Sequence, residues 1–212
     1  MSDFENNEEL IRELLNKLSH IDYVKPGEFP NIDLYMDQVT TFMNTHLSGS
    51  KIKADDKILT KAMINNYAKN NLLPPPVGKK YSKEHMIVLI FIYYLKNILS
   101  ISDIQAMINP LTDRFFDPAD NPGHICMEDI YGEVYAAIKE QLSTISADMD
   151  VKMKVDEHHF DNVKNPKDRE FLQKFVMICL LSFDIFQKKQ IVENLIGSIL
   201  PEDESKTDKS KK

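Results

Sequence analysis

The chain has very few cysteines and lacks the motifs of the common enzyme classes. Cys126 and Cys179 are its only two cysteines, and two distant thiols form neither a disulfide framework nor a clustered zinc motif. The sequence has no phosphate-binding glycine loop, no recognisable nucleophile motif and no metal ligands paired at helical spacing. We therefore expect a protein that is not an enzyme and needs no cofactor.

Long apolar runs are also missing from the sequence. No stretch reaches the length of a membrane span, and the first ten residues are acidic and polar, unlike a signal peptide. Hydrophobic residues make up 42% of the chain and charged residues 28%, which is ordinary for soluble globular proteins. We expect a cytoplasmic protein with no membrane partner.

Basic residues are in the minority, but they are concentrated in one segment. The formal net charge is −7, which argues against DNA as a partner, because affinity for DNA rests largely on neutralising phosphates. In residues 51–97, however, nine lysines face only three acidic residues, and the segments on both sides are acidic. Such a patch either solubilises an exposed helix or marks a DNA-binding surface.

The basic segment contains a short helix with clear ends. Thr60 is a good N-cap, because its hydroxyl can accept a hydrogen bond from the first helical turn. Apolar residues then follow at helical spacing on one face, with lysines and asparagines on the other. Asn70 and Asn71 tolerate the left-handed backbone that ends helices, and the prolines at 74–76 cannot continue one. The pattern predicts a helix over residues 60–70.

A turn and a second helix follow these prolines. Gly78 supplies the unusual backbone dihedral of the turn, and Lys79 and Lys80 stand at its tip. Ser82 is placed to cap a helix over residues 83–99. This helix is apolar on most of its sides, so we expect it to be the central helix of the N-terminal half.

Three stretches in this segment occur in an order that is typical of one known family. They are Ile64-Asn65-Asn66-Tyr67, Asn71-Leu72-Leu73-Pro74-Pro75 and Lys79-Lys80-Tyr81. Residues 60–108 thereby resemble the winged helix-turn-helix of the MerR family of transcriptional regulators, in its second helix, hinge and wing. More closely, the segment is similar to an uncharacterised bacterial family of MerR-like regulators, a domain of unknown function. Asn65, Lys79 and Lys80 replace arginines of the MerR pattern, and lysine lacks the bidentate fork of arginine.

The resemblance implies that the segment binds double-stranded DNA, with Lys61, Asn65 and Asn66 approaching base edges in the major groove. The other candidates would hold phosphates or probe the flanking minor groove: Thr60, Tyr67, Lys69, Lys79, Lys80 and Tyr81. The connection over residues 48–57 is long for a helix-turn-helix, and the rest of the chain is acidic. An alternative therefore stays open, a helical protein–protein interaction module that keeps the winged fold without binding DNA.

The remaining apolar patterns predict four more helices. Amphipathic spacing indicates helices over residues 4–18 and about 34–47, and the second would be the first helix of the winged motif. A turn-rich connector over 20–31 separates them. After the basic segment we expect a short helix over 101–108, ended by Asn109-Pro110, and a longer one over about 127–145.

Two clusters have both a functional and a structural interpretation. Asp156-Glu157-His158-His159 combines carboxylates with imidazoles, as metal sites do, but adjacent histidines point in different directions, which favours an exposed loop over residues 146–166. Phe91, Tyr93 and Tyr94 could line a ligand pocket, although core packing is the commoner use of aromatic residues.

The apolar residues after position 166 are nearly continuous. A single helix over residues 169–200 would be about 48 Å long, which exceeds what a small domain can bury. It would be a dimerisation helix, as in MerR-like proteins; the alternative is two core helices with a break near residues 187–190. Residues 201–212 lack apolar side chains other than a proline, so we expect a disordered tail.

These observations predict an all-α protein with a MerR-like winged helix-turn-helix in its N-terminal half and a long dimerisation-type helix in its C-terminal region. The predicted divisions are an N-terminal helix and connector (1–31), a DNA-binding domain (32–110), a helical dimerisation or regulatory region (111–200) and a tail (201–212). The predicted function is that of a dimeric, sequence-specific transcriptional regulator. A small-molecule or protein effector is possible, and its identity stays open.

Overall fold

The computed structural model describes residues 3–19, 24–51, 55–117, 125–156 and 160–199. The described residues form seven α-helices: α1 (Asp3–Ser19), α2 (Met36–Leu47), α3 (Lys61–Lys69), α4 (Lys83–Leu95), α5 (Ile101–Phe115), α6 (Met127–Asp156) and α7 (Pro166–Ile199). Strands β1 (Leu34–Tyr35) and β2 (Lys80–Tyr81) and the 3₁₀ turns η1 (Pro26–Glu28) and η2 (Ser48–Ser50) complete the described elements. The predicted all-α class is confirmed. The predicted tail at 201–212 lies outside the described residues.

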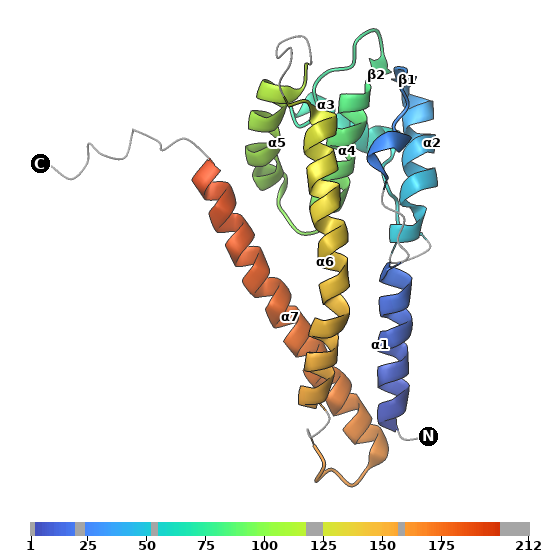
Figure 1. Cartoon of the computed structure of the whole chain (residues 1–212), viewed down its shortest axis with the longest axis vertical. Helices are drawn as coiled ribbons and strands as arrows, with labels where there is room; N and C mark the ends of the chain where they lie inside the picture. The colour runs from blue at the N-terminus through green and yellow to red at the C-terminus, as the bar shows by residue number, and fades with distance from the viewer. Residues whose placement is uncertain (1–2, 20–23, 52–54, 118–124, 157–159, 200–212) are drawn as a thin grey trace, which may run out of the picture.

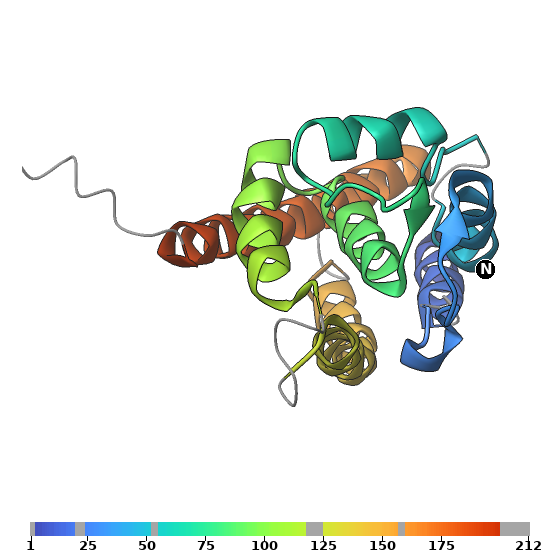
Figure 2. The same ribbon diagram turned by 90° about the horizontal axis from the view of Figure 1, so that it is seen from above.

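The helices form a compact body at one end of an elongated molecule. Figure 1 shows α2, α3, α4 and α5 gathered at the top, with the long helices α6 and α7 running down from this body and crossing below it. Helix α1 lies along the lower part of α6. In the view from above, α4 is surrounded by the other body helices and by the end of α6 (Figure 2). None of the described helices is long and apolar enough to cross a membrane.

Helix α4 is the centre of the body, as its composition predicts. Eight of its residues are buried, and Ile87, Val88 and Leu89 are fully enclosed. The helix is shorter than predicted, because it ends at Leu95, whose carbonyl accepts hydrogen bonds from the N–H groups of Ile98 and Leu99 at 2.9 Å each.

The predicted end of the next helix at Asn109-Pro110 is wrong. Helix α5 continues through Pro110 to Phe115. Proline removes one backbone hydrogen bond and strains a helix, but the turns beyond it place Leu111, Phe115 and Phe116 against the main core. This packing outweighs the local loss, which a local pattern cannot reveal.

Helix α6 also extends further than predicted, through residues 146–156. Met149 and Met153, one turn apart, pack with Met177 of α7 in a second, smaller core. Ile11 and Leu15 of α1 contact the same cluster. The mostly polar composition of this segment predicts an irregular structure. It is nevertheless helical, because Met149 and Met153 form an apolar stripe that packs against both α1 and α7.

Most of the predicted metal cluster belongs to a segment that the structure does not describe. Residues 157–159 of the Asp-Glu-His-His stretch lie outside the described residues. Among the residues that are described, no group of three or more histidine, cysteine or acidic side chains is arranged to hold a metal ion.

The C-terminal apolar segment is one continuous helix of 34 residues, about 51 Å long. The alternative of two helices with a break near residues 187–190 is therefore wrong. Few residues of α7 are buried; they include Met177 in the small core and Ile196 in the main core.

The main core does not end at the predicted domain boundary of residue 110. Met127, Tyr131 and Ile196 belong to the same buried cluster as α2, α3 and α4. The hydroxyl of Tyr131 donates to the carbonyl oxygen of Val24 at 2.6 Å, and burial raises the pKa of this hydroxyl far above its usual value. The first part of α6 is thus built into the body.

Candidate nucleic-acid interface

Helix α3 has the ends that its sequence predicts. The Thr60 hydroxyl accepts a hydrogen bond from the Met63 N–H at 3.2 Å. At the other end, Asn71 adopts a left-handed conformation with φ 56°, and the Leu72 N–H donates to the Tyr67 carbonyl at 2.9 Å. Bonds of this kind satisfy the last carbonyls of a helix. Helix α3 is therefore a short, well-defined unit with fixed ends.

One face of α3 packs in the core and the other faces solvent. Ile64 is fully buried, whereas the opposite face exposes Lys61, Asn65, Asn66 and Lys69. The side chain of Asn70 donates to the side-chain and backbone oxygens of Asn66, at 2.9 and 2.8 Å. Asn70 thus contacts the oxygen of the Asn66 side-chain amide and not its N–H groups. Figure 2 shows α3 at the outer edge of the body.

The predicted wing is a tight two-residue turn. Gly78 and Lys79 both have positive φ, 58° and 65°, and the Lys80 N–H donates to the Val77 carbonyl at 3.0 Å. Two left-handed residues in succession are the signature of a type I′ hairpin turn. The turn leads into β2, which pairs antiparallel with β1.

The wing and α3 meet at the start of α2. Lys61 of α3 forms an ion pair with Asp37 in the first turn of α2. The ammonium group of Lys80 lies 5.4 Å from the ring centroid of Tyr35, the residue that precedes α2. Both basic elements therefore contact two nearly adjacent residues, and together they form one surface, which we call the basic face.

Apart from Lys53 and the half-buried Lys51, the lysines of the basic segment divide into two groups. Lys83 pairs with Glu128 at 2.9 Å, and Lys96 donates to the Ile58 carbonyl at 2.6 Å, so these two bind parts of the fold together. Lys53 lies outside the described residues. The exposed lysines are Lys57, Lys61, Lys69, Lys79 and Lys80, of which all but Lys57 belong to α3 or the wing.

Three residues of the predicted contact set have structural contacts within the body. Tyr67 is 6% exposed and Tyr81 3%, and both belong to the main core. Thr60 is half-buried and its hydroxyl caps α3. The exposed members of the predicted set are Lys61, Asn65, Asn66, Lys69, Lys79 and Lys80.

The long connection before α3 is fixed to the body. The hydroxyl groups of Ser50 and Tyr93 lie 2.6 Å apart, and Ile58 and Leu59 are each 2% exposed. With the bond from Lys96 to Ile58, these contacts attach one end of the connection to α4 and the other to the residue that directly follows α4. Its length therefore does not leave α3 loosely held.

Sequence reasoning missed Tyr35 and Asp37 as members of the basic face. Both are placed there by the pairing of Tyr35 with Lys80 across the two short strands. A two-residue strand carries too little alternation to be recognised, and its partner is distant in the chain. The acidic Asp37 has no sequence signal that separates it from other helix-start carboxylates.

A buried histidine joins the wing to α4. His85 is 3% exposed, and its Nδ1 lies 3.0 Å from both the backbone nitrogen and the hydroxyl of Ser82. Its ring makes edge contacts with Tyr81 and Phe116. Burial lowers the pKa of His85, and the backbone of Pro75 and Pro74 opposes this shift only in part.

The lowered pKa of His85 predicts a loss of stability in acid. The unfolded chain takes up a proton near its ordinary pKa of about 6.5, while the folded protein resists it. The free energy of unfolding should therefore fall as the pH drops below about 6.5, with a slope of up to about 1.4 kcal/mol per pH unit. Urea unfolding at pH 7.5, 6.0 and 5.0 measures this slope. His85→Gln keeps an acceptor for the Ser82 N–H and should flatten it; an equal slope in both proteins would contradict the assignment.

One comparison with known proteins finds a relative family. The family model described as "Domain of unknown function (DUF1836)" matches residues 24–134. This range contains the whole body, from the segment before β1 to the first turns of α6. No curated protein and no solved structure matches the chain.

Proposed function

The chain belongs to the DUF1836 family, and we propose that its matched region is a MerR-like winged helix-turn-helix that binds double-stranded DNA. The observation that carries this proposal is the basic face. Four exposed lysines and two exposed asparagines gather on one short helix and one hairpin tip, and both elements are anchored to the start of α2. The segments on both sides of residues 51–97 carry more acidic than basic residues, so the excess of positive charge is confined to this segment.

In the proposed complex, α3 enters the major groove and the wing lies over the flanking backbone. A helix of nine residues, about 14 Å long, suits a groove about 12 Å wide. Asn65 and Asn66 carry amide groups that can bond adenine edges, and Lys61 can reach guanine. Lys69, Lys79 and Lys80 would neutralise phosphates.

The proposal includes a homodimer formed through α7. Its large apolar residues are between 54% and 67% exposed in the single chain: Phe171, Phe175, Ile178, Phe183, Ile185, Phe186, Ile191, Leu195 and Ile199. So many exposed apolar side chains on one helix are rare on monomers and indicate an interface. A symmetric dimer would carry two copies of α3 and would bind two half-sites in inverted orientation.

The alternative function is binding of an acidic protein segment by the same basic face. The ion pair between Lys61 and Asp37 favours it, because a carboxylate within the face repels phosphates. In that case the face would bind acidic peptides without preferring DNA. We propose a non-enzymatic, cytoplasmic role under both functions.

Selection of binding sites from random duplex DNA tests the proposal. The purified full chain should enrich a short inverted repeat, and its affinity should fall steeply between 50 and 200 mM salt, as it does for proteins that make several phosphate contacts. Failure to enrich any sequence, together with weak binding that is equal for all duplexes, would remove the regulator function and favour the protein-binding alternative.

A further inference from the structure

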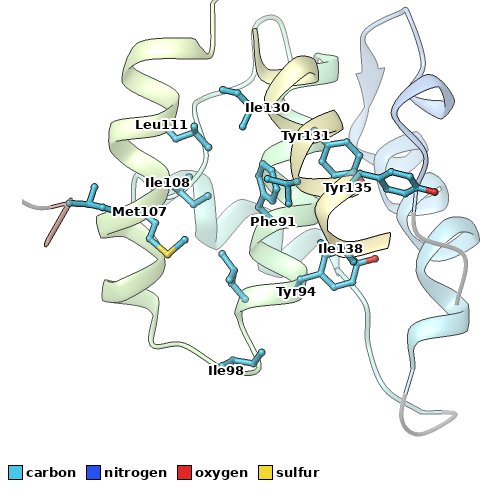
Figure 3. A pocket seen from close by; sticks show the side chains of 13 residues that line it. Phe91, Tyr94, Ile98, Met107, Ile108, Leu111, Ile130, Tyr131, Tyr135 and Ile138 are labelled. Atoms are coloured by element: carbon cyan, nitrogen blue, oxygen red, sulfur yellow. The ribbon is translucent and has the colours of Figure 1, made fainter. Parts of the chain in front are cut away.

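An apolar cavity of about 550 Å³ is lined by residues of α4, α5 and α6, and Figure 2 shows α6 on the side of α4 opposite α3. It is bounded by α4, α5 and α6, and Ile199 at the end of α7 closes one part of it. Figure 3 shows Phe91 at its centre, with Met107 and Leu111 of α5 on one side and the α6 residues on the other. Phe91 and Tyr94, two members of the aromatic cluster in the sequence, line this cavity, whereas Tyr93 belongs to the core.

The size and lining of the cavity suit a small organic molecule. Ligand sites in proteins have volumes of roughly 300–1,000 Å³ and mainly apolar walls with a few polar groups. All the described residues that line this cavity are aliphatic, methionine or aromatic, and none carries a charge. A charged ligand would lose its hydration without compensation, so the lining selects an uncharged one.

Among the described residues that line the cavity, the polar side-chain atoms are the hydroxyl groups of Tyr94, Tyr131 and Tyr135. In the view of Figure 3 the hydroxyl ends of Tyr94 and Tyr135 lie on the same side of the cavity, opposite Met107 and Leu111. The third tyrosine, Tyr131, already donates to Val24. The cavity thus has one polar edge and an apolar remainder.

From these features we infer that the cavity is a binding site for an uncharged, mainly aromatic or hydrocarbon molecule that carries a hydroxyl or carbonyl group at one end. The apolar part of the molecule lies against Phe91, Met107 and Ile108, and the polar end lies at Tyr94 and Tyr135. This site is separate from the basic face, and binding there does not require that the chain binds DNA.

The contacts of α5 indicate what such a ligand would regulate. The Gln105 side chain donates to the carbonyl oxygen of Asn70, at the end of α3, and Met107 and Ile108 follow within the same helix turn. The cavity also includes the end of α7. A ligand that shifts α5 or α7 would change how α3 is held or how two copies pair. This regulatory step rests on the proposed function, whereas binding itself does not.

The site can be tested with N-phenyl-1-naphthylamine, an uncharged probe that fluoresces in apolar surroundings, added to the full chain without DNA. Val134 lines the cavity and is 38% exposed, so a larger side chain at this position can occupy the cavity without displacing a fully buried core residue. Val134→Trp should weaken probe binding at least tenfold by filling the space. Val151→Trp is the matched control, since Val151 lies on the same helix, is 62% exposed and does not line the cavity; it should bind as the unchanged chain does.

A second measurement tests the polar edge. 1-Naphthol should displace the probe several-fold more effectively than naphthalene, and the difference should disappear in the double variant Tyr94→Phe/Tyr135→Phe. The inference is overturned if Val134→Trp binds the probe as tightly as the unchanged chain does. It is equally overturned if Phe175→Glu/Phe186→Glu on α7 abolishes probe binding, because the probe would then bind to the exposed face of that helix. It is also overturned if the probe binds only to monomeric α7 variants, because a second copy would then occupy the cavity. Probe binding by a chain that binds no DNA would overturn the proposed function and leave this site intact.

Discussion

Replacing Lys79 and Lys80 together by glutamine is expected to weaken binding to every DNA sequence by roughly a hundredfold or more near 0.1 M salt. Hydrogen bonds to charged groups contribute about 1.5–3 kcal/mol each, and two such phosphate contacts would be lost. The slope of log affinity against log salt should become shallower by about 0.9 for each contact removed. A fluorescence-anisotropy titration of a labelled duplex at several salt concentrations measures both quantities.

The choice of glutamine isolates the charge from the backbone. Lys79 has a φ of 65°, a conformation that every residue with a β-carbon finds strained, so the glutamine variant keeps the strain of the original residue. A glycine there would remove the charge and relieve the strain together. Glutamine also keeps two of the four methylene groups of Lys80 while it removes the cation that lies over the Tyr35 ring.

A second pair of neighbouring lysines provides the matched control. Lys188 and Lys189 lie on α7, away from the basic face, and pair with Asp184 and Glu193 of the same helix. Lys188→Gln/Lys189→Gln changes the net charge by the same amount and should leave affinity and salt slope almost unchanged. Equal losses in both double variants would show that only the overall charge matters, and the wing would lose its assigned role.

The ion pair between Lys61 and Asp37 of the basic face allows a substitution that should raise DNA affinity instead of lowering it. Asp37→Asn removes a carboxylate that pairs with Lys61 and would free that lysine for a phosphate or base. DNA affinity should therefore rise several-fold at low salt, by an amount that shrinks as salt screens the charges. A loss of DNA affinity, combined with loss of binding to acidic peptides, would instead favour the protein-binding alternative.

Local chemistry explains which parts of the body could be predicted from sequence. Thr60 at one end of α3 and Asn71 at the other act within a few residues of themselves, and so does the turn at Gly78. Their structural role is contained in the short stretch that surrounds them, and the predictions for these positions are confirmed. The predicted DNA contacts of the same stretch remain predictions.

The errors occur where distant packing decides the outcome. Helix α5 continues through Pro110 because residues beyond it reach the main core, and α6 continues to Asp156 because Met149 and Met153 meet α1 and α7. Neither partner is adjacent in the sequence. The set of basic-face residues predicted from the sequence lacks Tyr35 for the same reason: the pairing of β1 with β2 places Tyr35 beside Lys80, although the two residues are far apart in the chain.

The variant Phe175→Glu/Phe186→Glu is expected to convert a dimer into a monomer. These side chains are each 54% exposed in the single chain and lie about three helical turns apart on one face of α7. Burying a phenylalanine stabilises an interface by about 1.5–3 kcal/mol, and two copies contribute four such residues. The variant should lose roughly 6 kcal/mol or more of dimer stability, about four orders of magnitude in dissociation constant. Sedimentation velocity over a range of concentrations measures the change.

Because both positions are exposed in the single chain, the fold itself should survive the two glutamates. Thermal unfolding followed by circular dichroism checks this, and Gln187→Glu, an exposed position beside Phe186, adds one charge as the control and should stay dimeric. The monomeric variant should bind the inverted repeat no more tightly than it binds a single half-site. In a dimer, binding of one α3 brings the second α3 close to its half-site, and this effect is lost in the monomer. A variant that stays dimeric would place the interface elsewhere. An unchanged chain that is monomeric at all concentrations would mean that the exposed face of α7 meets a different protein, while the lysine variants would still decide whether the basic face binds DNA.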